Sequence, residues 1–254
     1  MLPLARTDGG VAAAADSLRG RVALVTGANG GLGRASALAA AAAGATVVLL
    51  GRNVRALEAV YDEIEALGAP TPALYPMDLA GAAAPDYADL AAALERQCGR
   101  LDGVVHAAAL FDGLQPFDQQ TPEAWARVQQ VNATAPFLLT RACLPLLRAS
   151  GDGAVVFVFD DVGRVGNAYW GAYGVAKHAL LGLASIVHEE TENSCVRTHA
   201  LLPGPMRTAL RRAAYYGENT LEHPQPAAAG AAIAWLLGPH AAPMRGKALD
   251  LRAP

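Results

Sequence analysis

Short hydrophobic runs alternate along this chain with longer segments in which hydrophobic residues recur every three or four positions. The short runs are rich in β-branched and aromatic residues and predict strands, whereas the longer segments are rich in alanine and leucine and predict helices. From residue 21 onward the two kinds alternate, which is typical of repeated β-α-β units in a parallel sheet. The predicted strands are Val22–Thr26, Thr46–Leu50, Pro72–Pro76, Gly103–His106, Ala154–Phe159, Val196–Leu202 and Ala248–Leu251.

Several of these strands are hydrophobic on both faces. The run from Val155 to Phe159 contains no polar residue, so it lacks the alternation of a sheet with one solvated face. Parallel sheets that helices cover on both sides have strands of this kind. The pattern therefore predicts an α/β fold with a doubly wound, seven-stranded parallel sheet of the Rossmann type.

The helices between the strands have readable boundaries. Thr121 is a good N-cap, Pro122 fits the first turn and Glu123 suits the positive end of the helix dipole, so a helix is predicted from here toward Arg148. The alanine tracts Ala39–Ala43 and Ala227–Ala232 also predict helix, since alanine has the highest helix propensity.

The ends of the chain and one long connection look different. Residues 1–20 are predicted to form a loose N-terminal arm, and residues 21–254 one Rossmann-type domain. The segment 203–226 is longer than ordinary connections and is a candidate substrate lid. Its Tyr215-Tyr216 pair fits either a substrate wall or an anchoring contact.

Composition excludes several classes of function. A net charge of −3 with no long basic run argues against nucleic acid and against a charged membrane surface. Residues 1–20 lack an apolar block long enough for a signal core or a spanning helix. The three cysteines (Cys98, Cys143 and Cys195) lie far apart, and the six histidines form no ligand cluster, so neither a disulfide framework nor a metal site is predicted. A small-molecule function in the cytoplasm is the expectation.

A glycine-rich turn directly follows the first predicted strand and leads into a helix. Backbone amides in such a turn can approach a diphosphate, and the helix dipole adds a favourable potential. Strand, glycine turn, helix and β-α-β repetition together indicate a dinucleotide site. The residues predicted to bind the cofactor here are Gly27, Asn29, Gly30, Gly31, Leu32 and Gly33.

The end of the second strand bears on the choice of cofactor. A carboxylate there usually binds the ribose 2′-hydroxyl of NAD, but this chain has Gly51-Arg52-Asn53. Arg52 offers a forked donor suited to a 2′-phosphate, so NADP(H) is favoured over NAD, and both Arg52 and Asn53 are predicted to contact the cofactor. The alternative for Arg52 is a solvated arginine at a strand end. Asp78, followed by Leu79, fits either an acceptor for the adenine amino group or a turn cap.

Tyr173 and Lys177 lie four residues apart at the start of a predicted helix after the fifth strand. Any helix places such a pair on one face, so the pair alone carries little weight. Together with the glycine turn, Asn132, and Pro203-Gly204 after the sixth strand, the Tyr-x-x-x-Lys motif resembles the short-chain dehydrogenase/reductase superfamily over nearly the whole chain from Arg21.

That resemblance implies roles for these residues. Tyr173 would be the general acid in carbonyl reduction and the base in alcohol oxidation, and Asn132 would hold a water that links the lysine to solvent. A phenol with an ordinary pKa of about 10 is a poor base at neutral pH, so the Lys177 ammonium must stabilise the phenolate. Lys177 would also hold the nicotinamide ribose, and the resemblance places Ala108, Pro203 and Gly204 beside the cofactor. The alternative is a structural role for Asn132, as a capping residue or at a helix kink.

The catalytic serine of the family is replaced. Thirteen residues before Tyr173, where that serine hydrogen-bonds the substrate carbonyl, this chain has Asp160. An ionised carboxylate cannot donate a hydrogen bond and would disfavour a neighbouring phenolate, whereas a protonated one, favoured by burial, could donate. Both states stay open.

A second departure is His106-Ala107-Ala108-Ala109, where the family commonly has an Asn-Asn-Ala-Gly stretch. The missing amide at Ala107 is expected to loosen the link between the central strands. His106 is expected to be a structural histidine at a strand end.

The expected function is an NADP(H)-dependent oxidoreductase that moves hydride between nicotinamide and a carbonyl or secondary alcohol. Candidate substrate contacts are Tyr169, Trp170, Met206 and Leu210, which favour a medium-sized apolar or aromatic compound but also fit core or interface packing. The alternative is a cofactor-binding protein with little reductase activity, because Asp160 replaces the serine. Between the two lies an enzyme in which Asp160 itself is the acid or base. The family resemblance also implies a homodimer or homotetramer formed through helices over 122–148 and 172–191.

Overall fold

The computed structural model describes residues 2–6 and 11–252, and its centre is an eight-stranded sheet in the order β1-β8-β7-β6-β5-β2-β3-β4. Every neighbouring pair runs parallel. The strands are β1 (Leu4–Ala5), β2 (Val22–Thr26), β3 (Thr46–Gly51), β4 (Ala73–Pro76), β5 (Gly103–His106), β6 (Gly153–Val158), β7 (Val196–Leu202) and β8 (Ala248–Asp250). The predicted parallel α/β sheet is confirmed, and its seven predicted strands correspond to β2 to β8.

The eighth strand lies in the segment that was expected to be a loose arm. Strand β1 pairs with β8 at the edge of the sheet, and the Ala248 amide donates to the Pro3 carbonyl at 2.9 Å. Leu2 and Leu18 are buried. The loose-arm prediction is therefore wrong for these residues, because strand pairing and buried leucines hold them; residues 1 and 7–10 of the arm lie outside the described ranges.

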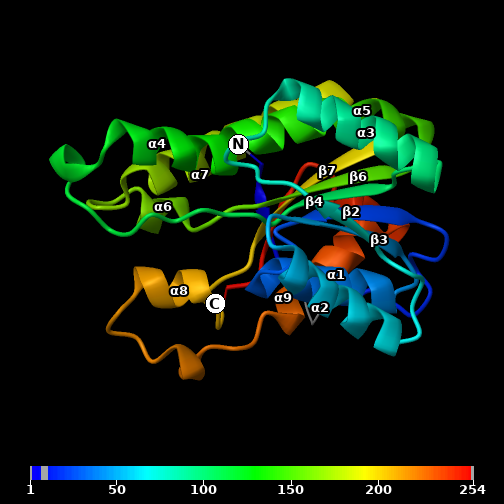
Figure 1. Cartoon of the computed structure of the whole chain (residues 1–254), viewed down its shortest axis with the longest axis horizontal. Coiled ribbons are helices and arrows are strands. Elements are labelled where there is room, and N and C mark those ends of the chain that lie inside the picture. Colours follow the sequence, from blue (N-terminus) through cyan, green and yellow to red (C-terminus); the bar gives the residue numbers. More distant parts are fainter. Residues whose placement is uncertain (1, 7–10, 253–254) are drawn as a thin grey trace.

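Helices cover both faces of the sheet (Figure 1). One face carries α1 (Gly31–Ala42), α2 (Val54–Ala66) and α9 (Ala227–Leu237), and the other carries α3 (Ala84–Cys98), α5 (Ala135–Ala149) and α7 (Gly171–Thr191). Every residue of β2, β5, β6 and β7 is buried, which explains why these strands show no polar alternation. No helix within the described ranges has the length and apolar character needed to cross a membrane.

The first alanine tract lies at the carboxyl end of α1 and the second lies in α9. These two helices pack against each other. A Cβ added at Gly230 of α9 would lie 2.5 Å from the Ala35 carbonyl carbon of α1. Small side chains therefore let the two helix backbones approach closely, which adds a packing reason to the helix propensity of alanine.

The helix predicted from Thr121 toward Arg148 is two helices joined by a wider turn. Helix α4 (Pro122–Gln129) begins as expected, with the Thr121 hydroxyl accepting from the Ala124 amide at 3.2 Å. A π-helical turn, η2 (Gln130–Thr134), separates it from α5. A single π-turn inside a longer helix often marks a functional position, and Asn132 lies within this one.

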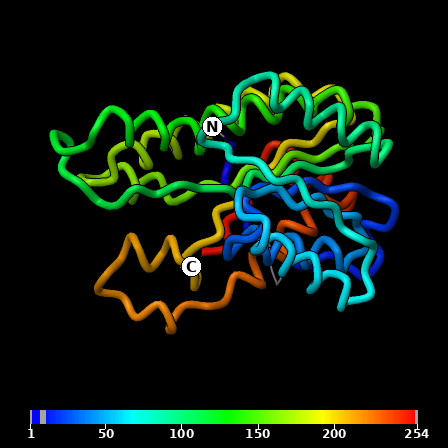
Figure 2. Tube along the Cα trace, in the orientation of Figure 1, coloured from blue at the N-terminus to red at the C-terminus, as the bar shows by residue number. Residues whose placement is uncertain are grey.

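The candidate lid has structure of its own. Segment 203–226 contains α8 (Ala209–Ala214) and η3 (Thr220–Glu222). In Figure 2 this orange segment extends beyond the same end of the sheet as the green loop 107–121, which contains η1 (Phe117–Gln119). The remaining short helices are α6 (Val162–Val165) and η4 (Pro239–Met244).

Topology fixes where a ligand can bind. From β2 the chain builds outward in one direction through β3 and β4, and then in the other direction through β5, β6 and β7. In such sheets the crevice forms at the carboxyl ends of the strands, where the direction of building reverses. The glycine turn after β2, the loop after β5 and the segment after β6 all meet at this crevice.

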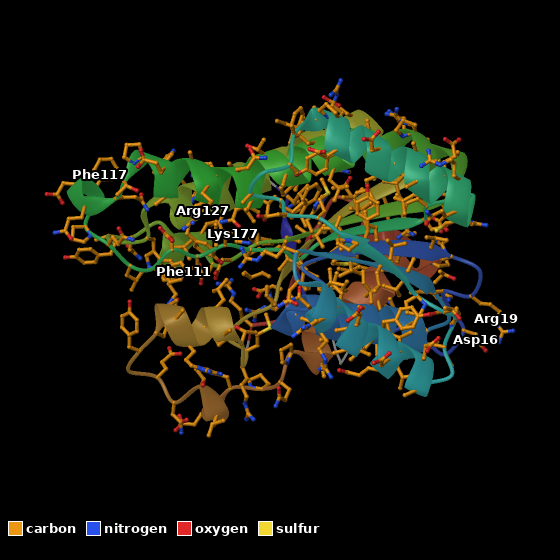
Figure 3. The ribbon with its side chains drawn as sticks, viewed as in Figure 1. Asp16, Arg19, Phe111, Phe117, Arg127 and Lys177 are labelled. Atoms are coloured by element: carbon orange, nitrogen blue, oxygen red, sulfur yellow. The ribbon has the colours of Figure 1, made fainter. Side chains whose placement is uncertain are left out.

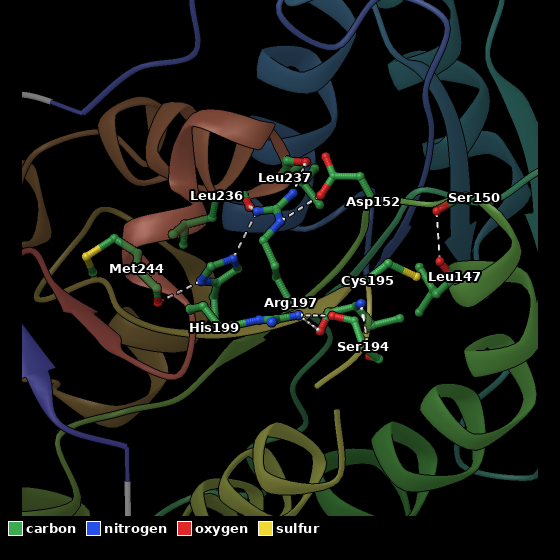
Figure 4. Close-up of polar contacts among 12 residues, drawn as sticks. Leu147, Ser150, Asp152, Ser194, Cys195, Arg197, His199, Leu236, Leu237 and Met244 are labelled. Atoms are coloured by element: carbon green, nitrogen blue, oxygen red, sulfur yellow. Dashed lines mark hydrogen bonds and ion pairs between the residues drawn. The ribbon is translucent and has the colours of Figure 1, made fainter. Parts of the chain in front are cut away.

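The opposite end of the sheet is held by a buried arginine. Arg197 of β7 is 5% exposed, and its guanidinium contacts Asp152 at 2.9 Å and the Leu236 and Leu237 carbonyls at the end of α9 (Figure 4). Arg21 binds the second carboxylate oxygen of Asp152 and also reaches the Leu237 carbonyl. One carboxylate and two guanidinium groups thereby secure the carboxyl end of α9, where backbone carbonyls lack helical partners.

His199 completes this cluster as a neutral side chain. Its Nδ1 donates to the Met244 carbonyl at 2.9 Å, which leaves Nε2 to accept from Arg197 at 3.2 Å (Figure 4). Burial and the adjacent Arg197 charge lower the pKa of His199 to about 3. The cluster therefore needs Asp152 as its anion.

We expect Asp152→Asn to lower the free energy of unfolding. Partial burial raises the pKa of Asp152, but its hydrogen bonds and ion pairs with Arg197 and Arg21 outweigh this and hold the pKa below its ordinary value. The loss should be about 1 to 2 kcal/mol, at the low end for a buried pair because the Asp152 side chain is 36% exposed.

Urea unfolding at several pH values measures this loss. Since the folded pKa is depressed, the stabilisation is present above the ordinary pKa of aspartate and disappears as the pH falls below about 4. Asp16→Asn is the matched control, because Asp16 pairs with Arg19 at the exposed surface (Figure 3). Equal losses in the two variants would contradict the assigned role of Asp152.

Candidate active site

The turn between β2 and α1 is built for close backbone approach. Gly27 has φ +64°, and a Cβ there would lie 2.9 Å from the Ala108 Cα. A Cβ at Gly33 would lie 2.1 Å from the Gly27 carbonyl oxygen. Gly30 provides no side-chain cap for α1, and no acidic residue lies in the first turn, so the N-terminal amides of α1 stay open to an anion. The cradle fits a dinucleotide diphosphate.

A threonine ties this turn to the next strand of the crevice. The Thr26 hydroxyl donates to the Val105 carbonyl and accepts from the Ala107 and Ala108 amides, each at 3.1 Å. The missing family amide at position 107 is therefore offset by backbone bonds to Thr26. Ala108 lies directly over the glycine turn, where a cofactor would rest.

His106 is structural, as its position at a strand end predicts. Its Nε2 contacts the Thr140 hydroxyl at 2.8 Å and its ring stacks on Phe157 with centroids 4.8 Å apart. Burial lowers its pKa to about 3, so the ring is neutral.

At the end of β3, packing rather than cofactor space explains the glycine. A Cβ at Gly51 would lie 2.8 Å from the Asn29 side-chain oxygen and 3.2 Å from Leu57 Cδ2. A side chain at position 51 would therefore require the Asn29 side chain to move. Arg52 is exposed and has no ion pair within the described ranges, so its guanidinium is available to a ligand.

Two neighbours that were predicted to bind cofactor serve local structure. The Asn53 side chain accepts from the Ala56 amide at 3.1 Å and caps α2. Asp78 accepts from the Ala80 amide at 3.1 Å, which matches the turn-cap alternative. Leu79 is buried in the core on the α3, α5 and α7 face.

The start of α7 places the phenol and the ammonium together. Tyr173 and Lys177 are each 4% exposed, and the Lys177 nitrogen lies 5.5 Å from the centroid of the Tyr173 ring. Lys177 donates to the Val158 carbonyl at 3.0 Å, which anchors it to the end of β6. Burial lowers the pKa of Lys177 to about 8, against a smaller opposing effect of the Asp160 charge.

Asn132 lies near this pair, and both ends of its side-chain amide are bonded to Leu110. Its side-chain oxygen accepts from the Leu110 amide at 2.8 Å, and its side-chain nitrogen donates to the Leu110 carbonyl at 2.7 Å. These two bonds fix the loop after β5 against the π-helical turn. A buried asparagine with this geometry positions the loop, and its remaining acceptor capacity is what could hold a water.

Asp160 is the direct partner of the phenol. The Tyr173 hydroxyl donates to Asp160 Oδ2 at 2.9 Å, and the Asp161 amide donates to the other oxygen, Oδ1, at 2.8 Å. Burial, together with the charge and the hydrogen bond of Asp160, raises the pKa of Tyr173 well above its ordinary value. Asp160 is only partly buried, so the burial on which a neutral carboxyl was expected to depend is incomplete.

An aromatic cluster borders Tyr173. Trp170, 7% exposed, has its ring centroid 5.8 Å from Tyr173 and 5.7 Å from Tyr215, and Phe111 packs edge-on to Tyr173 at 5.4 Å. Leu210 packs against the same cluster. Figure 3 shows Phe111 and Lys177 toward the same end of the molecule, far from Asp16 and Arg19.

The other two predicted substrate contacts lie differently. Tyr169 is 58% exposed at φ +74°, and its carbonyl accepts from the Gln115 amide at 3.1 Å, so the residue shapes the loop. Met206 packs against the core on the α1 and α9 face rather than against the aromatic cluster. Of the predicted set, the structure brings Trp170 and Leu210 to the phenol.

Several residues near the crevice are not among the site residues that the sequence predicts. Thr208 caps α8, and its methyl carbon would lie 2.8 Å from a Cβ at Gly31, so the candidate lid touches the glycine turn directly. A threonine before a helical run is a cap signal that could have marked it. Tyr215 was left between two interpretations, and Arg211 stacks on its ring at 3.6 Å. Pro203 and Gly204 lie just after β7, where Gly204 has φ +72°.

Comparison with known proteins agrees with this geometry. The short chain dehydrogenase family profile matches residues 21–219. The uncharacterized oxidoreductase YciK of Escherichia coli (strain K12) is 37% identical over 235 residues, covering 92% of this chain and 93% of YciK. A Pseudomonas syringae structure described as a short chain dehydrogenase superposes with a TM-score of 0.91 at 42% identity, covering 97% of this chain and 99% of that one. A Shigella flexneri chain with the same description, solved in complex with NADP, gives a TM-score of 0.89 at 37% identity, covering 93% and 99%.

Proposed function

The chain belongs to the short-chain dehydrogenase family, and from that premise we propose that it is an NADP(H)-dependent oxidoreductase acting on a carbonyl or secondary alcohol. The observation that carries the proposal is the buried Tyr173–Lys177 pair, which lies at the same end of the parallel sheet as the glycine cradle. The NADP bound by the Shigella flexneri relative supports the cofactor.

Different residues at the crevice would bind different parts of the cofactor. Amides of the turn from Gly27 to Gly33 would hold the diphosphate, Arg52 the 2′-phosphate, and Lys177 the nicotinamide ribose. When bound, the nicotinamide supplies or accepts the hydride. The chain itself orients the substrate, excludes water and moves the proton.

In this proposal the Tyr173 phenol transfers the proton. Tyr173 gives its proton to the oxygen of the substrate as carbonyl reduction develops negative charge there, and the Lys177 ammonium stabilises the phenolate that remains. Because the pKa of Tyr173 is raised, the phenol is protonated at ordinary pH, which is the state that carbonyl reduction starts from.

The aromatic cluster supports a proposal for the class of substrate. Phe111, Trp170 and Tyr215 surround the phenol with flat apolar surfaces, and Leu210 adds an aliphatic contact. Such a wall favours a medium-sized apolar or aromatic carbonyl compound. NADPH oxidation against aromatic and alicyclic ketones and aldehydes, paired with cofactor titration, tests the function; cofactor binding without any turnover would favour the cofactor-binding alternative.

An exposed apolar face supports self-association. Phe137 of α5 and Val175 and Ile186 of α7 are 48%, 49% and 57% exposed, with Ala179 and Gly182 between them on α7. Apolar side chains repeated along two neighbouring helices are typical of an interface between copies. The proposed assembly is a homodimer or homotetramer formed through α5 and α7.

The first prediction of the proposed function concerns Arg52. NADPH should bind at least ~10-fold more tightly than NADH, about 1.4 kcal/mol, and Arg52→Ala should erase most of that gap. Calorimetric titration of both cofactors measures it. Arg96→Ala, an exposed arginine near the end of α3, should leave the ratio unchanged; equal affinities in the unmodified protein would sink the NADP assignment.

A second prediction separates the phenol from the ammonium. Tyr173→Phe should remove turnover while cofactor affinity stays nearly intact, whereas Lys177→Ala should weaken both. In the unmodified protein, reduction should slow as the pH rises through about 8, because Lys177 then loses the charge that stabilises the phenolate. Full turnover by Tyr173→Phe would show that another group supplies the proton.

The third concerns Asp160. A side chain at this position can polarise the substrate carbonyl only by donating a hydrogen bond, which a serine hydroxyl does at any ordinary pH. Asp160→Ser should therefore retain or increase activity, while the alkaline decline assigned to Lys177 persists. Asp160→Ala should reduce activity by roughly 10- to 1000-fold, the scale of a lost oxyanion donor.

Steady-state rates against pH for the three proteins decide the matter. If Asp160→Ser abolishes an activity that the unmodified protein shows, Asp160 is itself the acid or base and the serine-like role is wrong.

A further inference from the structure

Arg252, which follows the last strand, forms an ion pair with the loop after β6. Arg252 forms a fork with Asp250 of β8, with Nε to Oδ1 and Nη2 to Oδ2 each at 3.0 Å. Its third nitrogen, Nη1, contacts Asp161 Oδ2 at 2.6 Å. Asp161 directly follows Asp160, so Arg252 joins the last strand to the loop after β6.

Asp161 passes this constraint on to the phenol. Its Oδ1 accepts from the Gly163 amide at 3.1 Å, and its own amide donates to Asp160 Oδ1 at 2.8 Å. Asp160 Oδ2 then accepts the hydrogen bond from Tyr173. A continuous series of hydrogen bonds therefore runs from Asp250 through Arg252, Asp161 and Asp160 to Tyr173.

The aliphatic part of Arg252 is also fixed in place. A Cβ at Gly204 would lie 3.3 Å from Arg252 Cγ and 3.4 Å from its Cα, so the turn after β7 packs against this residue. The Leu251 amide donates to the Leu202 carbonyl at 2.9 Å, which holds the adjoining backbone to the end of β7. A rigid base of this kind lets a guanidinium set the orientation of its partner.

We propose that Arg252 is a positioning residue. It holds Asp161, and through it Asp160, in the orientation that accepts the hydrogen bond from the Tyr173 hydroxyl. The charge of Arg252 also offsets the second of two adjacent carboxylates, which would otherwise repel the first. The kinetic part of this proposal rests on the function proposed above, whereas the bond to Tyr173 does not.

Other cations lie near the aromatic cluster and need to be separated from Arg252. The Lys177 nitrogen lies 5.5 Å from the centroid of the Tyr173 ring, whereas Arg164 of α6 and Arg211 of α8 lie over the ring of Tyr215. Within the described residues, Arg252 is the one cation that forms an ion pair with Asp161. Removal of Arg252 therefore changes the Asp161 end and leaves the other cations where they are.

Tyrosine labelled with ¹³C at Cζ reports the bond without substrate or cofactor. Tyr173→Phe assigns the Tyr173 resonance, and Asp160→Ala gives its position when the carboxylate is absent. At neutral pH, Arg252→Ala should move the resonance by at least about half of the difference between the unmodified protein and Asp160→Ala. Arg252→Lys, which keeps the charge, should restore most of the shift.

Two further variants keep the result interpretable. Arg6→Ala is the matched control, because Arg6 contacts the same Asp250 carboxylate at 3.4 Å but not Asp161, and it should leave the resonance in place. Asp161→Asn weakens the same link from the other side with Arg252 intact, and should move the resonance in the same direction even if Arg252→Ala fails to fold.

On any carbonyl compound that the unmodified protein reduces, Arg252→Ala should lower kcat about 10-fold with KM nearly unchanged, and lysine should recover it. A Tyr173 resonance that stays at its unmodified position in both Arg252→Ala and Asp161→Asn overturns the proposal. Absence of any turnover in the unmodified protein would instead count against the proposed function, and the resonance would still decide the role of Arg252.

Discussion

A phenol and a carboxylate are bonded directly at the carboxyl edge of this sheet, Tyr173 donating to Asp160 over 2.9 Å. Both groups are held from behind: the start of α7 is anchored to β6 through Lys177 and the Val158 carbonyl, and Asp160 is anchored through the Asp161 amide. These bonds fix the two segments that place the phenol and the carboxylate within hydrogen-bond distance. The state of that shared proton therefore governs what the crevice can do to a substrate.

The parallel sheet is what brings these groups within reach. Asp160 lies just after β6, and Tyr173 lies in the first turn of α7. The cofactor cradle follows β2, and Asn132 fixes the loop after β5. The carboxyl ends of parallel strands lie at the same end of the sheet, so residues more than a hundred positions apart meet there. The Arg197 cluster at the other edge secures α9, which packs against α1 and so supports the helix whose N-terminus forms the cradle.

The sequence predicts the parts of this structure that depend on repeated local pattern. The central strands have hydrophobic runs on both faces, and the glycine turn lies where a strand is followed by a helix, so both can be recognised in the sequence alone. The two-residue strand β1 has no such pattern and depends on pairing with β8, two hundred and more positions away. The π-turn at Asn132 likewise depends on bonds to Leu110. The sequence also marks Asp160 as unusual, but its bond to Tyr173 and the contact of Arg252 with Asp161 exist only once loops and strands have met.

In the proposed mechanism, an aspartate at position 160 acts on the Tyr173 proton differently from a serine. A serine hydroxyl is neutral at every ordinary pH and leaves the neighbouring ammonium free to stabilise a phenolate. A carboxylate accepts the phenol proton and adds negative charge, and it acts in the same direction as burial, which raises the pKa of Tyr173. Lys177 opposes both, but its own pKa of about 8 means that its charge fades in the alkaline range where a phenolate would form. The ammonium is thus least available when the base form of Tyr173 needs it most, whereas the acid form needs it only after the proton has left. Burial and Asp160 therefore keep Tyr173 in its protonated form, and Lys177 opposes them only over the pH range in which it carries its charge.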